Sequence, residues 1–222
     1  MSKKLIAPCL AVAVFATLAM ASIASASPVL THPTGTVQVP GVGITATNVG
    51  ETLMTDTNTN VINRCPTSNL SWEMTKNTGT SIEGNVTAAS FTGTGSEGTC
   101  TGTFFGSPKV TTAVVNGLPW CVRATSAMAP DEAQMRGGKC SEPAREIRFA
   151  IDLGSITCLY ARSASEPSKA TITTDNAEGQ DAVIHLDHQL FKPVSVPFPC
   201  PEETLLDMSF TLSSGGTPAF FS

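Results

Sequence analysis

The chain has few charged and few aromatic residues for its length, and it has no long apolar run beyond its first segment. Charged residues make up 14% and aromatic residues 6% of the 222 residues. No later stretch approaches the about 18 continuous apolar residues of a membrane-spanning helix, so we expect no transmembrane segment after the N-terminal one. No segment of about 11 residues or more shows a helical stripe, which argues against a helical domain.

The sequence also lacks the motifs of common enzyme classes. It contains no G-x-S-x-G nucleophile elbow, no H-E-x-x-H zinc motif and no Walker A loop. Residues 93–98 match the G-x-G-x-x-G fingerprint, but another predicted strand follows where a phosphate-binding helix would have to begin. We therefore interpret this segment as a glycine-rich turn, and we expect no catalytic residue and no cofactor.

Clusters of metal ligands are missing as well. No C-x₂-C pair suits zinc. Residues 185–188 (His-Leu-Asp-His) are the one His/carboxylate cluster, and on a strand His188 points to the opposite face from His185. Residues 56–60 (Asp-Thr-Asn-Thr-Asn) imitate the start of a calcium loop, but the following glycine and the closing glutamate are absent. We predict no metal site and interpret 56–60 as a polar hairpin loop.

The first 26 residues have the layout of a secretory signal peptide. Lys3 and Lys4 precede an apolar run from Leu5 to about Met20, and small residues close the segment at 24–26. We predict cleavage before residue 27 and a secreted, extracellular bacterial protein, free or held at the cell surface. After cleavage the net charge is −7, because Lys+Arg falls from 13 to 11 while Asp+Glu stays at 18. Nucleic acid is therefore not an expected partner.

Six cysteines remain after this cleavage. An even number in an exported chain predicts three disulfides, although sequence alone does not determine the pairing. A meander places strands beside their sequence neighbours, so neighbouring cysteines meet most easily. We predict the sequential pairing Cys65–Cys100, Cys121–Cys140 and Cys158–Cys200.

Apolar and polar residues alternate with a period of two through most of the mature chain. The clearest examples lie at 70–75, 147–153, 181–187 and 206–213. Further candidates, rich in Thr, Val, Ile or aromatic residues, lie at 36–40, 43–48, 81–92, 101–105, 109–115, 119–124, 156–163 and 168–174. We predict a single all-β domain over residues 36–222, an antiparallel β-sandwich, with a partly closed β-barrel as the alternative. Residues 27–35 are predicted to form a flexible N-terminal segment.

The segment 126–146 differs from the strands around it. It is rich in charged residues and contains two adjacent glycines. We predict a long connection between strands, with one or two helical turns at most near 131–136. Methionine and aromatic side chains suit adaptable apolar contacts. We therefore place a candidate binding surface on this loop and the neighbouring strand edge, formed by Trp120, Met128, Met135 and Arg136.

A family resemblance lies in the segment 84–120. It contains Ala-Ser-Phe-Thr-Gly at 89–93, then Cys100, then Gly-Leu-Pro-Trp at 117–120. This order resembles small secreted bacterial proteins called alkane-oxidation activators, over roughly residues 60–125. It also looks like uncharacterised secreted actinobacterial proteins, a likeness that extends to 206–212. The resemblance implies export and a role in hydrocarbon use, and it implies no defined mechanism.

Three hypotheses of function follow. The leading one is a secreted, non-enzymatic protein that binds apolar small molecules, acts at hydrocarbon or lipid surfaces, or contacts cell-envelope components. The first alternative is a structural envelope or matrix component or an adhesin, because Thr-rich strands allow edge-to-edge association. The second is a secreted hydrolase with an unrecognised site, in which His185 or His188 would work with an unidentified serine.

Overall fold

The structure is a computed structural model that describes residues 29–31, 38–58, 60–94, 98–104, 106–128, 132–173, 182–195, 197–198 and 200–221. The predicted signal peptide and most of the predicted flexible segment lie outside these residues. Every named element of the described chain is a β-strand, as the alternating pattern predicts. No helix in this part of the chain is long and apolar enough to cross a membrane.

Fourteen of the strands form two closed rings of antiparallel strands that share β14 and β15. The first ring is β2 (Gly43–Asn48), β5 (Thr67–Thr78), β6 (Ser81–Thr92), β9 (Trp120–Thr125), β10 (Glu132–Gly137), β13 (Ser168–Thr173), β14 (Val183–Ser195) and β15 (Thr204–Ser214). The second ring continues from β14 and β15 through β3 (Thr52–Asp56), β4 (Val61–Cys65), β7 (Cys100–Phe104), β8 (Ser107–Asn116), β11 (Ile147–Asp152) and β12 (Thr157–Arg162).

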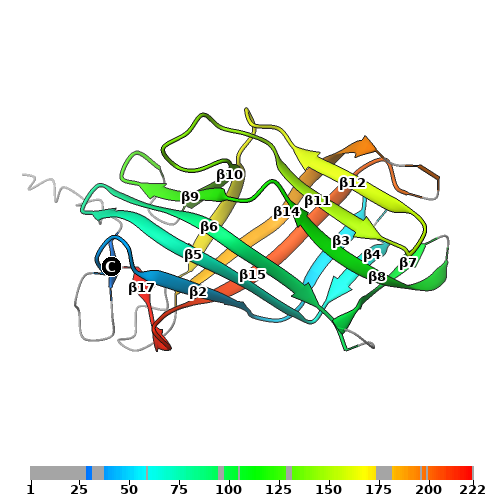
Figure 1. The fold of residues 1–222 in the computed structure, drawn as a ribbon, viewed down its shortest axis with the longest axis horizontal. Helices are drawn as coiled ribbons and strands as arrows, with labels where there is room; N and C mark the ends of the chain where they lie inside the picture. The colour runs from blue at the N-terminus through cyan, green and yellow to red at the C-terminus, as the bar shows by residue number, and fades with distance from the viewer. Residues whose placement is uncertain are drawn as a thin grey trace, which may run out of the picture.

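The two shared strands run through the middle of the molecule (Figure 1). One half of β15 pairs with β3 and the other half with β2, while β14 pairs with β13 and then with β12. A bulge between Leu186 and Gln189 separates the two halves of β14, and His188 in that bulge has a positive φ of 49°. Bulges bend a strand and re-aim its side chains, which suits a strand that serves two rings.

Side chains that point inward from both rings form one apolar core. Phe149 lies at an aromatic cluster in which its ring centroid is 5.3 Å from those of Trp120 and Phe191 and 5.7 Å from that of Phe91. The predicted all-β antiparallel fold is therefore confirmed. Both rings belong to one continuous sheet rather than to two separate sheets, because β15 pairs with strands of both.

All three predicted disulfides are confirmed. Cys65–Cys100 joins the neighbouring strands β4 and β7, and Cys121–Cys140 ties β9 to the connection after β10. Cys158–Cys200 ties β12 to the segment before β15. The two cysteines of a pair are 35, 19 and 42 residues apart, and Cys65 meets Cys100 because β4 pairs with β7.

The predicted long loop at 126–146 is wrong in its central part. Residues 132–137 form β10, which pairs with β9 on one side and β13 on the other, and no helical turn forms there. Ala133 and Met135 point into the core, while Glu132, Gln134 and Arg136 point outward. The segment is short and its outward residues are charged or polar, so its alternation is easily mistaken for a solvated connection.

The start of the described chain is also more ordered than predicted. Leu30–Thr31 forms β1, which pairs with β17 (Phe220–Phe221). The one strand not yet named among the described residues is β16 (Thr217–Pro218). The Leu30 side chain is fully buried. The Leu30 N–H donates to Asn77 Oδ1 at 3.1 Å, and Asn77 Nδ2 donates to the carbonyl of Leu30 at 2.8 Å. Within the segment predicted to be flexible, a buried asparagine thus holds the backbone of Leu30.

Candidate functional site

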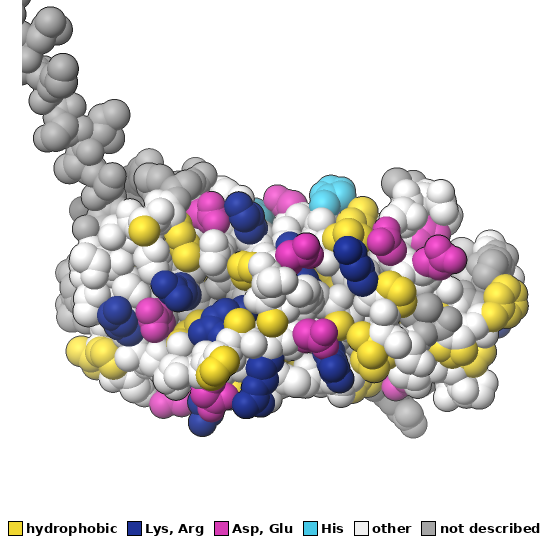
Figure 2. Space-filling view, turned by 90° about the horizontal axis from the view of Figure 1, so that it is seen from above, with side chains coloured by type: hydrophobic (Ala, Val, Ile, Leu, Met, Phe, Trp, Pro, Cys, Tyr) yellow, Lys and Arg dark blue, Asp and Glu magenta, His cyan; other side chains and the backbone are white. Residues whose placement is uncertain are grey.

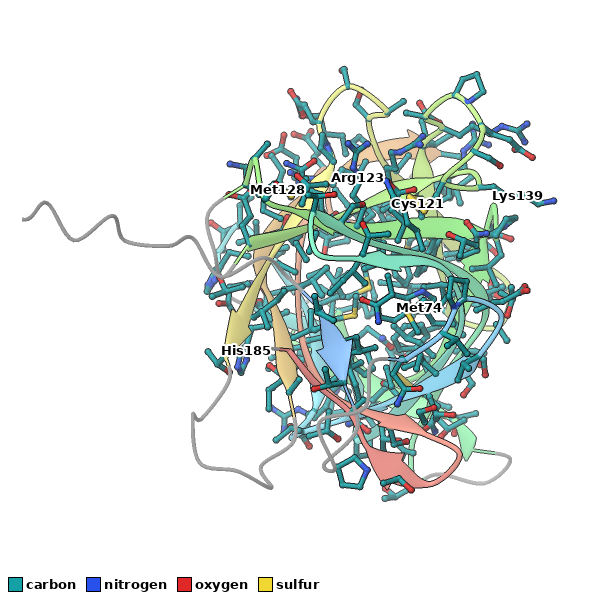
Figure 3. The ribbon with its side chains drawn as sticks, turned by 90° about the vertical axis from the view of Figure 1, so that its left-hand side faces the viewer. Met74, Cys121, Arg123, Met128, Lys139 and His185 are labelled. Carbon is teal, nitrogen blue, oxygen red and sulfur yellow. A yellow bond between two sulfur atoms is a disulfide. The ribbon has the colours of Figure 1, made fainter. Side chains whose placement is uncertain are left out.

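The predicted binding surface does not exist as a surface. Trp120 is 0% and Met135 3% exposed, because both point inward from their strands into the core. Met128 is half-buried and follows the end of β9. Figure 3 shows Met128 at one end of the upper side of the molecule. Lys139, in the connection after β10, lies at the other end. This prediction is therefore wrong for Trp120 and Met135.

Arg136, the fourth residue of that set, has a structural role. Its guanidinium donates to the carbonyl of Cys140 at 3.1 Å and to the carbonyl of Glu142 at 3.1 Å. The Cys140 N–H in turn donates to Asn85 Oδ1 at 2.9 Å. Together with the Cys121–Cys140 disulfide, these bonds fix the connection after β10. The guanidinium donors thus serve the fold rather than a ligand.

The His/carboxylate cluster is split into two separate sites. His185 Nδ1 lies 2.8 Å from Ser209 Oγ, and His185 Nε2 lies 2.8 Å from Thr173 Oγ1. His188 instead pairs with Asp207, with Nδ1 and Oδ1 3.2 Å apart. Ser209 is thus a serine within hydrogen-bond distance of His185. Among the described residues no carboxylate bonds to His185, so the third member of a serine, histidine and carboxylate triad is not in place.

Large apolar side chains on the surface are scattered. Figure 2 shows them interspersed with charged side chains on the face that it presents. The exposed ones in the described chain are Val39, Val49, Val110, Val114, Val194 and Phe198. Single exposed apolar residues are normal on soluble proteins and mark no interface.

A cleft with a volume of about 840 Å³ lies at one end of the second ring. Four segments that are far apart in the sequence form it: the β3–β4 turn, the β7–β8 turn, the second half of β14 and the segment before β15. Clefts of several hundred Å³ at the mouths of closed sheets are common ligand sites. We therefore take this cleft as the candidate site.

The floor of the cleft is apolar and its rim is fixed to the core. Ile62 and Phe104 line it with exposures of 1% and 5%. The rim segment 200–203 is attached to β12 in two ways: through the Cys158–Cys200 disulfide and through Tyr160, whose hydroxyl donates to the carbonyl of Pro201 at 3.0 Å. A rim held in this way changes shape little when a ligand binds, which lowers the entropy lost on binding.

Charged groups surround this apolar floor. Asp56, Glu202 and Glu203 supply three negative charges, and Lys192 supplies one positive charge, which gives a formal charge of −2. Within the described residues, Lys192 and the two glutamates take part in no ion pair. These three side chains are therefore available to a ligand.

Asp56 is used differently from the glutamates. Its Oδ1 accepts bonds from the backbone N–H groups of Asn58 and Asn60 at 2.9 and 2.8 Å, and its Oδ2 accepts one from Asn60 Nδ2 at 2.8 Å. Residues 56–60 therefore connect β3 to β4 in a polar hairpin, as predicted. Burial first, and the charge of Asp56 second, raise the pKa of the Tyr160 phenol well above its ordinary value.

Sequence analysis missed the cleft, because no local pattern shows that the four segments meet. Two weak signals were present, the polar turn at 56–60 and the cysteine at position 200. Comparisons of the chain with protein-family models, with curated proteins and with solved structures found no match.

Proposed function

We propose that this protein is a non-catalytic binding protein that acts outside the cell and holds a small organic molecule with an apolar part in the cleft. The observation that carries the proposal is the combination of an apolar floor with unpaired charged side chains around it. Apolar walls supply affinity, and a few polar groups orient the ligand.

Two further observations support this proposal. The three disulfides are typical of proteins that fold in an oxidising compartment. The described lining of the cleft contains neither histidine nor serine, so its side chains suit binding better than acyl transfer. The resemblance to alkane-oxidation activators is compatible with an apolar ligand.

The rival hypotheses draw less support from the molecule. Adsorption to a hydrocarbon surface needs an extended apolar patch, whereas the exposed apolar residues are scattered. Edge-to-edge association needs an unpaired strand, whereas each strand of the two rings pairs with two neighbours. A bound molecule in the cleft explains the described features and requires neither an extended apolar patch nor an unpaired strand.

The test is to map the binding of a neutral amphiphile, octyl glucoside below its micelle concentration, by chemical-shift perturbation in ¹⁵N-labelled protein. We expect perturbed resonances to concentrate at the four segments of the cleft. Thr103→Trp places a large side chain at the lining and should abolish the shifts. Thr47→Trp, on the outward face of β2, is the matched control and should leave them unchanged. Shifts spread over the surface, or equal in both variants, would refute the proposal.

A further inference from the structure

We infer that the ligand of this cleft is an organic cation, an ammonium or related group attached to an apolar chain or ring. This inference rests on the proposed function and adds the chemical class of the ligand. It follows from how charge is distributed over the lining, from which of those charges are already engaged, and from where the apolar surface lies.

One negative charge of the lining is engaged, and two negative charges and one positive charge remain available. Asp56 is occupied by three hydrogen bonds within its own turn. Glu202 and Glu203 accept no bond of this kind, and Glu203 is half-buried, so its charge is less screened by water than that of an exposed side chain. Lys192 and Glu202 are both exposed, so their opposite charges are screened alike, and the half-buried Glu203 leaves an excess of negative charge. The strongest available field therefore attracts positive charge.

The same lining contains apolar groups. Ile62 and Phe104 are its buried apolar side chains, and Pro193 and Pro201 add apolar wall without any side-chain donor. A molecule with a positive group at the rim and an apolar part on the floor satisfies both features. An anion of the same shape would meet two free carboxylates and one free ammonium group, so the excess of negative charge disfavours it.

The backbone that carries the two glutamates is attached to the fold independently of any ligand. Both follow Cys200 and Pro201, which the disulfide and the Tyr160 hydroxyl attach to β12, and Thr204 directly after them donates its hydroxyl to the carbonyl of Thr55 at 2.9 Å. The rim is thus attached on both sides of the two glutamates. Preorganised charges discriminate between ligands better than mobile ones.

The experiment compares three probes that share one octyl chain: octyltrimethylammonium, octyl glucoside and octyl sulfate, each below its micelle concentration. Isothermal titration calorimetry at low salt should give the tightest binding for the ammonium compound, with an affinity about tenfold or more above that of the sulfate. Added salt should reduce this difference, because it screens the carboxylates. Circular dichroism in each titration checks that the fold is retained.

A charge reversal at the rim separates the local field from the net charge of the protein. Glu203→Lys should weaken ammonium binding about fivefold or more and strengthen sulfate binding. Glu73→Lys on β5, an exposed residue outside the cleft, changes the net charge equally and should alter either affinity less than about twofold. Lys192→Glu should strengthen ammonium binding.

The outcomes distinguish this inference from the proposed function. Cleft binding of the glucoside or the sulfate as tight as that of the ammonium compound would overturn the inference while leaving a ligand-binding cleft. Equal effects of Glu203→Lys and Glu73→Lys would also overturn it. Failure of all three probes to bind would overturn the proposed function.

Discussion

Replacement of Gly84 by alanine should destabilise the protein far more than a single methyl group suggests. Gly84 faces inward on β6, and a Cβ built there would lie 1.2 Å from Trp72 Nε1 and 2.3 Å from its Cδ1 and Cε2. Real Cβ atoms do not approach other atoms this closely. Trp72 is only 4% exposed, so its indole has little room to move and must leave its position.

The size of the effect follows from this geometry. Overpacking a core by one methyl group typically costs about 1–3 kcal/mol, and full displacement of a buried tryptophan costs about 3–5 kcal/mol. We expect a loss of about 3 kcal/mol for Gly84→Ala, which in a domain of this size lowers the melting temperature by roughly 6–12 °C.

Equilibrium unfolding in guanidinium chloride measures this loss, with Gly43→Ala as the control. Gly43 is also a strand residue, but a Cβ there would meet no atom within 4 Å. The control should change the stability by less than about 1 kcal/mol. In Gly84→Ala/Trp72→Leu the clash is absent, so the double variant should lose less stability than the sum of the single variants. Equal stability of Gly84→Ala and Gly43→Ala would refute the argument.

Three further predictions concern the rim and the connection after β10. Replacement of Cys158 and Cys200 by serine removes a cross-link that spans 42 residues and should cost about 4 kcal/mol, measured by denaturant unfolding; a loss below about 1 kcal/mol would contradict it. Tyr160 is the single tyrosine of the chain, and its pKa is raised in the folded protein. The protonated phenol therefore contributes fully to stability below the unfolded pKa of about 10. This contribution is lost as the pH rises through the higher pKa of the folded protein. The phenolate absorbance of the native protein should therefore stay absent at pH values where the unfolded chain shows it, and Tyr160→Phe should unfold less readily in alkali than the parent; titration near the ordinary pKa would contradict this. Arg136→Ala should increase hydrogen exchange at 138–146, and Arg136→Lys should restore protection only in part, because an ammonium group lacks the guanidinium fork; unchanged exchange in the alanine variant would count against the role of Arg136.

The parts of the fold that sequence predicts are those governed by neighbours along the chain. The strand β15 alternates buried and half-exposed residues over its full length, and this pattern is visible in the sequence. The disulfides pair cysteines that follow one another in the sequence, 35, 19 and 42 residues apart. In both cases the information is local.

The parts that sequence misses depend on contacts between distant segments. Trp120 looks like a surface anchor until the closed rings place it beside Phe149. Met135 is buried because β10 has a neighbour on each side, and no pattern within residues 132–137 shows that neighbour. The cleft needs turns and strand ends from four segments at once, so it becomes visible only after ring closure.

The sharing of β14 and β15 by both rings has a consequence for the order of folding. These two strands are the last long strands of the chain, and neither ring can close until both are in place. Closure also joins β15 to β2, whose residues lie more than a hundred positions earlier in the chain. The Thr211 hydroxyl, for example, donates a hydrogen bond to the carbonyl of Thr47, which is 164 residues away in the sequence. Contacts of such long sequence separation make folding slow. A chain that lacks its last twenty or so residues should therefore form neither ring, and the two halves of the molecule should fold and unfold together.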